Sequence, residues 1–315
     1  MMLGIIAGQT KVVFRFHVTP ASTVLADYYY DLADAPGEFW ERVRSDGGDV
    51  RVYLQNGTTK TARQVVAFDY ENHVGGLFFA RGGGTSFWIE SGSGQAEPAA
   101  NSTHGKSAVW ETDAMLVAHL EDASDSTVNA QNGTWDPDEP TYATGKLQSA
   151  VDFDGAHMIN FGDLGSLPSQ GTISFWMRTP LQVGGYRGLS TTNKTGANSC
   201  LRLEQTGTFL YLYDGVQAKS FTTGLTTAQS LVTFTWDVVA NNISTYFNGA
   251  PVASGEGHFP ATIPELVIGY GFNGPPRYWD GLVDELRVYS RALAAAEVAA
   301  MYANQNAPNT FWSPS

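Results

Sequence analysis

Short alternations of apolar and polar residues recur along the chain and constrain its fold more than any other feature. A period of two is expected of a strand with one face in a core and the other in water. Turn residues such as the pair Asn56–Gly57 follow or separate these segments, as in hairpins. The clearest alternations lie at residues 14–18, 50–54, 173–178, 231–236 and 266–270.

Helical periodicity is clear in one segment alone, the alanine-rich stretch from Ala292 to Asn304. Residues 36–43 could add a helical turn or two. Charged residues make up only 16% of the chain and Gly occurs 34 times, a composition that favours sheets and turns over helices. The sequence therefore predicts an all-β fold built from two β-sandwich domains, the second a jelly roll with one short C-terminal helix.

A polar stretch rich in Gly, Ser and Ala, Ser91 to Ser107, divides the chain. With 315 residues and about 150 residues per domain, two domains are expected. We place an N-terminal β-sandwich domain at residues 1–107 and a jelly-roll domain at 108–305. Residues 306–315 contain two prolines and are predicted to form an exposed C-terminal tail.

The net charge of −13 argues against binding to nucleic-acid phosphates. Cys200 is the only cysteine, which excludes an intrachain disulfide and a cysteine-based zinc site. No run of about 18 apolar residues predicts a membrane span. The apolar start, Met1 to Gly8, has no basic residue before it and does not match a secretory signal. We therefore expect synthesis in the cytoplasm and no membrane insertion.

Three stretches resemble laminin-G-like, concanavalin A-like jelly-roll modules of bacterial and phage surface proteins. They are Leu116 to Thr134, Leu147 to Gly162 with the strand that follows from Gly171, and Trp279 to Tyr302. The resemblance covers roughly residues 110–305 and implies the same jelly-roll fold.

The segment SDGGDVRVYLQNGT, residues 45–58, is similar to an uncharacterised β-rich domain that precedes such modules. Its family pattern is Asp-Gly-x-Asp-Val-Arg-Val. No activity is established for that domain, so it implies at most a docking or assembly module.

Glucanases that share the jelly-roll architecture need two carboxylates about 5 Å apart. Asp284 and Glu285 are the only acidic pair on a predicted strand, but adjacent strand residues are expected on opposite faces. Glu204 stands alone, and the sequence SGSGQ at residues 91–95 lies in the polar connector and not in a nucleophile elbow. We predict that the protein is not an enzyme.

The resemblance also implies a structural Ca²⁺, which requires six to eight oxygen ligands. The segment from residue 121 to 132 offers Glu121, Asp122 and Asp125, and the C-terminal motif adds Asp284. The alternative is that Asp122 and Asp125 accept backbone N–H bonds in turns.

Glycans bind by stacking on aromatic faces beside a few polar groups. Two loops contain such residues. An alternative interpretation is that Trp279 and Tyr278 pack against the edge of the sandwich. The predicted ligand-binding residues are Tyr270, Phe272, Asn273, Arg277, Tyr278 and Trp279 in one loop and Tyr186 and Arg187 in the other.

These observations support three hypotheses of function. The first is a non-catalytic phage virion surface protein, such as a head decoration, head fibre or tail component, that displays a jelly roll able to bind host-surface glycans. Its expected partners are other virion proteins, copies of itself and a host polysaccharide, with no nucleic acid. The alternatives are a bacterial extracellular or cell-surface carbohydrate-binding or adhesion protein, and a glycoside hydrolase of the same fold.

Overall fold

The computed structural model describes residues 13–179, 185–194, 200–222, 225–273 and 276–314. The chain forms two compact units. Unit 1 comprises Met1–Val109 together with Ala307–Ser315, and unit 2 comprises Trp110–Asn306. The first segment of unit 1 ends at Val109, whereas the expected boundary follows residue 107.

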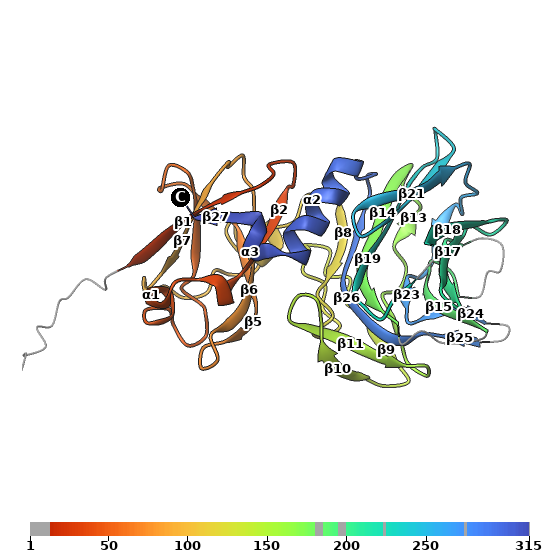
Figure 1. Cartoon of the computed structure of the whole chain (residues 1–315), viewed down its shortest axis with the longest axis horizontal. Helices are drawn as coiled ribbons and strands as arrows, with labels where there is room; N and C mark the ends of the chain where they lie inside the picture. The colour runs from red at the N-terminus through yellow and green to blue at the C-terminus, as the bar shows by residue number, and fades with distance from the viewer. Residues whose placement is uncertain (1–12, 180–184, 195–199, 223–224, 274–275, 315) are drawn as a thin grey trace, which may run out of the picture. The chain divides into compact units, whose positions relative to one another are not determined.

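Unit 1 contains two antiparallel sheets in its described part (Figure 1). The larger sheet has the order β27 (Trp312–Pro314), β1 (Phe14–Pro20), β7 (Phe87–Ser91), β3 (Arg51–Leu54) and β4 (Lys60–Thr61). The smaller has the order β2 (Asp27–Asp31), β6 (Val74–Ala80) and β5 (Arg63–Asp69). Short helices η1 (Leu32–Asp34), α1 (Gly37–Trp40) and η2 (Lys106–Ala108) connect the strands.

Aromatic rings from both sheets form the core of unit 1. Phe79 of β6 meets Phe87 of β7 with ring centroids 4.9 Å apart, and Tyr28 of β2 meets Phe87 at 5.5 Å. Trp312 of β27 lies 5.3 Å from Tyr28. Unit 1 is therefore a sandwich whose core includes a residue from the far end of the chain.

The prediction of an exposed C-terminal tail is wrong. Residues 308–311 form α3 (Pro308–Phe311), and β27 pairs with β1 in the register Val18 to Pro314. Trp312 is only 7% exposed, and its Nε1 donates to the carbonyl of Tyr29 at 2.9 Å. Burial of this large ring outweighs the two prolines, which are tolerated because one starts a helix and the other lies in an edge strand.

Unit 2 is built on two large antiparallel sheets in its described part, seen as separate layers in Figure 1. The eight-stranded sheet has the order β10 (Thr141–Thr144), β11 (Ser149–Asp154), β26 (Asp280–Tyr289), β14 (Gln170–Arg178), β19 (Ser230–Asp237), β20 (Asn242–Phe247), β21 (Ala250–Gly255), with β8 (Ala114–Ala118) also paired to β26. The seven-stranded sheet has the order β18 (Ala218–Thr222), β17 (Phe209–Tyr213), β16 (Arg202–Thr206), β15 (Tyr186–Thr191), β23 (Val267–Ile268), β12 (Met158–Asn160), β9 (Thr134–Asp136). Two short pairs, β13 (Gly165–Ser166) with β22 (Thr262–Ile263) and β24 (Tyr270–Asn273) with β25 (Pro276–Tyr278), complete it.

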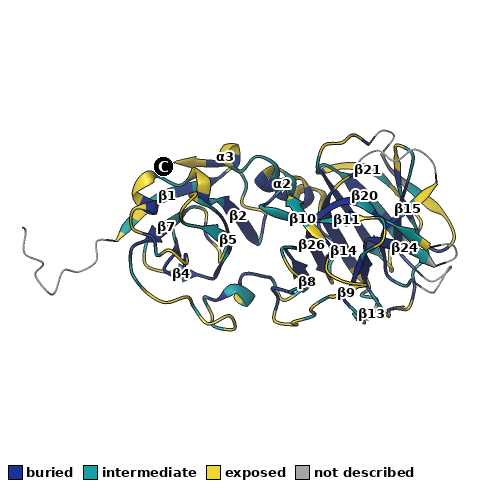
Figure 2. Cartoon of the chain, turned by 90° about the horizontal axis from the view of Figure 1, so that it is seen from below, coloured by how far each residue is buried: buried dark blue, intermediate teal, exposed yellow. Residues whose placement is uncertain are grey.

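One apolar core fills the space between these two sheets. Phe175 and Val283 reach it from the eight-stranded sheet, and Leu203 and Leu212 from the seven-stranded sheet. The strands β14 and β26 are correspondingly dark in Figure 2, which marks most of their residues as buried. The all-β prediction is confirmed, and unit 2 is a sandwich of two large antiparallel sheets.

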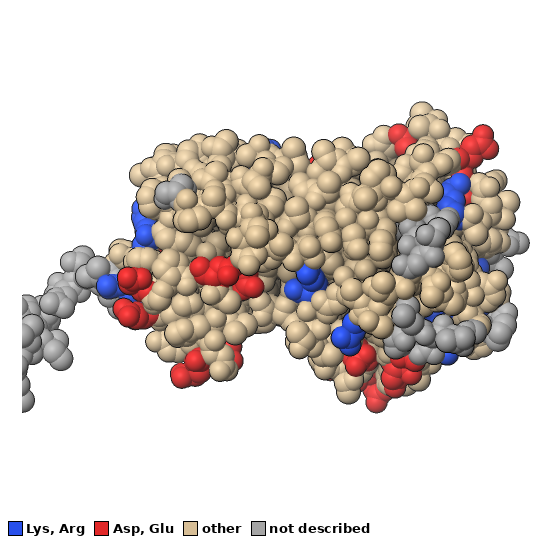
Figure 3. Space-filling view, viewed as in Figure 1, with Lys and Arg blue, Asp and Glu red and all other residues tan. Residues whose placement is uncertain are grey.

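The helix expected over 292–304 is α2 (Ala295–Asn306). Its Gln305 accepts a hydrogen bond from Nε1 of Trp176 at 2.6 Å, and Tyr302 stacks on the same indole. No helix in the described ranges has the length and apolar character needed to cross a membrane. Lys and Arg are few and scattered on the face shown in Figure 3, where most of the surface is uncharged.

Replacing Trp312 with alanine tests the role of the C-terminal strand. The variant Trp312→Ala should destabilise unit 1 by about 3–5 kcal/mol, because it empties a large site in the aromatic core. Urea denaturation followed by Trp fluorescence and by circular dichroism measures the loss. Asn309→Ala, at an exposed position of α3, is the matched control and should leave the transition in place. An unchanged denaturation midpoint for Trp312→Ala would contradict the role of Trp312 in the core of unit 1.

Candidate functional site

The outer face of the seven-stranded sheet carries polar and aromatic side chains. Leu203 and Leu212 point into the core. Their neighbours Glu204 and Tyr211, which pair across β16 and β17, therefore lie on the opposite face. This alternation leaves a row of functional groups outside the sandwich.

The hairpin of β24 and β25 crosses this outer face at a point where two glycines meet. A Cβ atom added to Gly188 of β15 would lie 2.0 Å from the backbone nitrogen of Gly271 in β24 and 2.6 Å from the carbonyl oxygen of Arg277. Only glycine permits this approach of two backbones. The contact fixes the position of the hairpin on β15.

Glu204 anchors the hairpin through Arg277. Its carboxylate is 1% exposed and accepts a hydrogen bond from Nη1 of Arg277 at 2.7 Å. Arg202 places its Nε 3.2 Å from the same oxygen, and the Tyr211 hydroxyl donates to the other oxygen at 3.0 Å. Burial, together with the charge of Glu204, raises the pKa of Tyr211, so this phenol remains a donor.

Arg277 in turn fixes an exposed aromatic ring. Its guanidinium lies 4.4 Å from the ring centroid of Tyr186 and 5.2 Å from that of Phe272. Tyr186 is 48% exposed. We call the surface formed by Tyr186, Phe272 and Arg277 the Tyr186 platform: a planar cation and an open ring, held from below by a buried carboxylate.

The other predicted ligand-binding residues have different positions. Trp279 is fully buried in the core, as its packing alternative predicts. Tyr270 is also buried and packs edge to face with Tyr278 at 4.9 Å. Arg187 pairs in register with Gln205. The side chain of Asn273 lies outside the described residues.

Sequence reasoning missed the residues that hold the platform. Arg202 and Tyr211 were not singled out, and Glu204 was considered only as a catalytic carboxylate. The alternation in RLEQT and FLYLY, residues 202–206 and 209–213, places these side chains on one face. That signal identifies the face but not the partner, because Arg277 is 73 residues distant from Glu204.

Two of the predicted calcium ligands, Asp125 and Asp122, accept hydrogen bonds from nearby turns. Asp125 uses both oxygens to accept hydrogen bonds from the backbone N–H groups of Val117, Thr127 and Gln131 and from the Thr127 hydroxyl. Asp122 accepts from the N–H of Ser124. These are the turn contacts of the alternative interpretation, and N–H donors occupy the positions that a cation would need. Within the described ranges, no three His, Cys, Asp or Glu side chains are placed to hold a metal.

Asp284 and Glu285 do not follow simple alternation. Glu285 has a φ of +54° and β26 has an irregular register with β14 nearby. Val283 and Leu286 both reach the core, so the two carboxyl groups between them share the outer side of the eight-stranded sheet. The expectation that they lie on opposite faces is wrong because a bulge inserts one residue.

The surroundings of this acidic pair are structural. Asp284 accepts hydrogen bonds from the backbone N–H groups of Lys146 and Leu147 at 2.8 and 3.0 Å. Glu285 meets Nδ1 of the buried His119 at 2.6 Å and Arg287 at 3.5 Å. Burial, and then the charge of Glu285, raises the pKa of Asp284 well above the usual carboxyl range.

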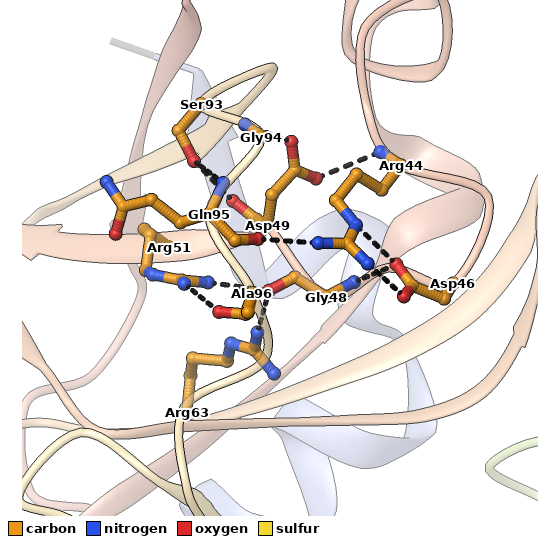
Figure 4. Close-up of polar contacts among 10 residues, drawn as sticks. All are labelled: Arg44, Asp46, Gly48, Asp49, Arg51, Arg63, Ser93, Gly94, Gln95 and Ala96. Carbon is orange, nitrogen blue, oxygen red and sulfur yellow. Dashed lines mark hydrogen bonds and ion pairs between the residues drawn. The ribbon is translucent and has the colours of Figure 1, made fainter.

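The Asp-Gly-x-Asp-Val-Arg-Val segment of unit 1 forms a polar cluster, shown in Figure 4. Asp49 accepts from the N–H groups of Arg44 and Gly94 at 2.9 and 3.0 Å. The buried Arg51 donates to the carbonyls of Gly48, Val50 and Ala96, and Arg63 donates to Gly48 and Val50. Burial, and the nearby Arg63, lowers the pKa of Arg51. Hydrogen bonds between the motif and the SGSGQ stretch therefore stabilise both segments, which is a structural role.

A family model described as the concanavalin A-like lectin/glucanases superfamily, of laminin G-like type, matches residues 153–299. This range includes β15, β16, β24 and β25 and therefore the whole Tyr186 platform. No curated protein sequence matches the chain.

Solved structures are similar to part of the chain in fold. Domain 4 of AbnA, an extracellular arabinanase of Geobacillus stearothermophilus solved with arabinotriose, has 24% identity and a TM-score of 0.51, with 61% of this chain and 100% of that domain covered. The binding domain of Paraclostridial Mosquitocidal Protein 1 has 15% identity and a TM-score of 0.49, covering 60% of this chain and 52% of that one. The binding domain of botulinum neurotoxin DC, solved with SialylT, has 12% identity and a TM-score of 0.47, covering 61% and 51%.

Neutralising Glu204 tests whether it anchors the hairpin. Glu204→Gln should lower the free energy of unfolding of unit 2 by about 2–3 kcal/mol, because two partly buried guanidinium groups lose their counter-charge. Chemical denaturation measures the change, and Glu256→Gln, at an exposed position, is the matched control. Equal stability of the two variants would show that Glu204 contributes little.

Asp284 should make stability depend on pH. The pKa of Asp284 is higher in the folded protein than in the unfolded chain, where it has the ordinary carboxyl value of about 4. At a pH between these two pKa values, Asp284 is protonated in the folded protein and ionised in the unfolded chain. Its contribution to stability therefore rises as the pH is lowered through that window. Asp284→Asn, which mimics the protonated form, should flatten this part of the pH profile of thermal melting. A profile identical to that of the parent protein would contradict the prediction.

Proposed function

We propose that unit 2, a concanavalin A-like jelly roll, is a non-catalytic glycan-binding module whose site is the Tyr186 platform. The observation that carries the proposal is the exposed Tyr186 ring against a guanidinium that a buried carboxylate holds in place. Sugar rings stack their C–H faces on such aromatic rings, and neighbouring polar groups orient their hydroxyls.

The chemistry of Arg277 suits this role. A guanidinium has five N–H donors in a fixed plane, and the bond to Glu204 uses Nη1. Because Glu204 also fixes the orientation of the plane, the ligand does not have to order it. The remaining donors are the groups that we expect to meet sugar hydroxyls beside the Tyr186 ring.

The arrangement of carboxylates supports binding without hydrolysis. A retaining glycosidase needs one carboxylic acid and one carboxylate about 5 Å apart on the substrate. Glu204 lies on the seven-stranded sheet, whereas Asp284 and Glu285 lie on the eight-stranded sheet. Glu204 also has two arginines and a tyrosine as partners, so both of its carboxylate oxygens already contact protein groups.

The similarity in fold to a domain solved with arabinotriose supports the carbohydrate class and makes arabino-oligosaccharides the first probes. We propose that the protein is located on the surface of a phage virion, because its sequence resembles modules of phage surface proteins. Mass spectrometry of purified particles tests this setting. Recovery in a bacterial cell-envelope fraction instead would support the adhesion alternative.

Binding to arabinotriose and to a panel of bacterial surface polysaccharides, measured by titration calorimetry on the full chain, tests the module. Tyr186→Ala should weaken binding about tenfold, since a stacking contact is worth about 1–1.5 kcal/mol. Tyr186→Phe retains the ring and should retain most of the affinity.

Arg277→Lys keeps the charge but loses the planar donors, so it should also bind more weakly. Val239→Ala, an exposed residue between β19 and β20, is the control. Saturable binding that Tyr186→Ala leaves unchanged would place the site elsewhere. Binding to no glycan on the panel would contradict the proposed function.

A further inference from the structure

A cavity lies in unit 2 where β9 begins and β12 ends. The two strands pair in the register Met158 to Asp136 and Asn160 to Thr134, and β9 is the last strand in the order of the seven-stranded sheet. The cavity has a volume of about 390 Å³ and is lined by residues 131, 132, 134–136 and 160–162. Ligand pockets span about 300–1,000 Å³, so this volume suits a small ligand. We call this cavity the β9 pocket.

Two amide side chains of the β9 pocket are oriented by main-chain groups. Nε2 of Gln131 donates to the carbonyl of Phe161 at 2.5 Å. Oδ1 of Asn132 accepts from the backbone N–H of Asp125 at 2.9 Å. A carbonyl can only accept and an N–H can only donate, so these bonds decide which end of each amide is which. The other end is then an acceptor, Oε1, in Gln131 and a donor, Nδ2, in Asn132.

The loop that carries these amides is itself held by hydrogen bonds. The backbone N–H of Gln131 donates to Oδ2 of Asp125 at 2.9 Å. The N–H of Asn132 donates to the carbonyl of Ala130 at 2.9 Å, and the N–H of Gly133 to that of Ala123 at 2.8 Å. The turn contacts of Asp125 therefore keep both amides in place before any ligand arrives, which lowers the entropy cost of binding.

Strand β9 supplies the remaining chemistry of the pocket. Trp135 packs against the core of unit 2 and remains partly exposed. Thr134 and Asp136, two residues apart on the same strand, are both exposed. Among the described residues that line the pocket, Asp136 is the only charged one. The β9 pocket thus combines one aromatic ring, a hydroxyl, a carboxylate and two oriented amides.

We propose that the β9 pocket binds a neutral sugar, as a second glycan site of unit 2 that shares no residue with the Tyr186 platform. A sugar hydroxyl both donates and accepts, so adjacent hydroxyls can donate to Gln131 and Asp136 and accept from Asn132. The C–H face of the sugar ring then contacts Trp135.

The lining favours this class of ligand over two others. The carboxylate of Asp136, with no cation among the described lining residues, repels phosphates, sulfates and uronic acids. A flat apolar ligand needs apolar walls on both of its faces. Of the two aromatic residues in the described lining, Phe161 is only 1% exposed, so Trp135 offers one wall. A ligand with one apolar face and a rim of hydroxyls fits this arrangement.

The test uses the full chain carrying Tyr186→Ala, so that binding at the Tyr186 platform is weakened. The probes are L-arabinose, D-glucose, D-galactose and D-mannose, together with the uronic acids of the three hexoses. Each is titrated separately and followed by NMR of the Trp indole N–H and Asn side-chain signals. Trp135→Phe and Asn132→Asp identify the two signals of interest. We expect at least one neutral sugar to shift both in a saturable way.

Asn132→Asp retains the oxygen that accepts from Asp125 but replaces the donor with a second oxygen. The affinity for that sugar should fall about fivefold or more, because one hydrogen bond is lost. Asn241→Asp, at an exposed position between β19 and β20, is the matched control and should leave the affinity unchanged. The uronic acids should bind more weakly than the best neutral sugar, and Asp136→Asn should narrow this difference.

Three results would overturn the proposal: a Trp135 signal that no neutral sugar shifts, an affinity that Asn132→Asp leaves unchanged, or tighter binding of a uronic acid. Sugar binding that the parent chain shows and Tyr186→Ala abolishes would also overturn it, while supporting the Tyr186 platform. Binding that shifts the Trp135 signal in both proteins to the same extent would support the β9 pocket. The two sites can therefore fail independently.

Discussion

The apolar core between the two sheets of each unit decides which side chains remain for function. In unit 2, Leu203 and Leu212 must face the core, and strand geometry then directs Glu204 and Tyr211 outward. The Tyr186 platform is thus a consequence of the core, because a shift of one residue in β16 would exchange the two sets. The hairpin that supplies Arg277 is fixed by the same sheet, at the glycine contact between β15 and β24.

Charges buried on the sheet faces are compensated in two different ways. Glu204 has arginines within hydrogen-bond distance, and Arg51 and Arg63 have backbone carbonyls. An arginine cannot lose its charge in a protein, so its burial requires acceptors. Asp284 instead lies beside another carboxyl group, and protonation lowers the cost of burying it. The first kind of site can hold a rigid binding surface, whereas the second responds to pH.

The sequence predicts those features that depend on local pattern. Alternation identifies the strands around Ile173, Leu210 and Val232, and alanine-rich periodicity identifies α2. Features that depend on contacts between residues far apart in the chain are not visible in the sequence. The C-terminal strand has no alternation. It forms because Trp312 packs against Tyr28, Phe79 and Phe87, which lie more than 200 positions earlier in the chain. The pairing of Glu204 with Arg277 likewise requires a hairpin placed by two glycines.

The acidic pair of β26 shows how a single backbone angle can change a functional argument. With regular alternation, Asp284 and Glu285 would face opposite sides, and a shared role would be impossible. The positive φ of Glu285 brings both to one side, next to His119 and Arg287. Even so, Asp284 binds the backbone of residues 146–147 and Glu285 binds His119, so proximity of the two carboxyl groups does not by itself supply a site for substrate. What distinguishes the Tyr186 platform is that its anchoring groups have partners while an aromatic ring remains open to solvent.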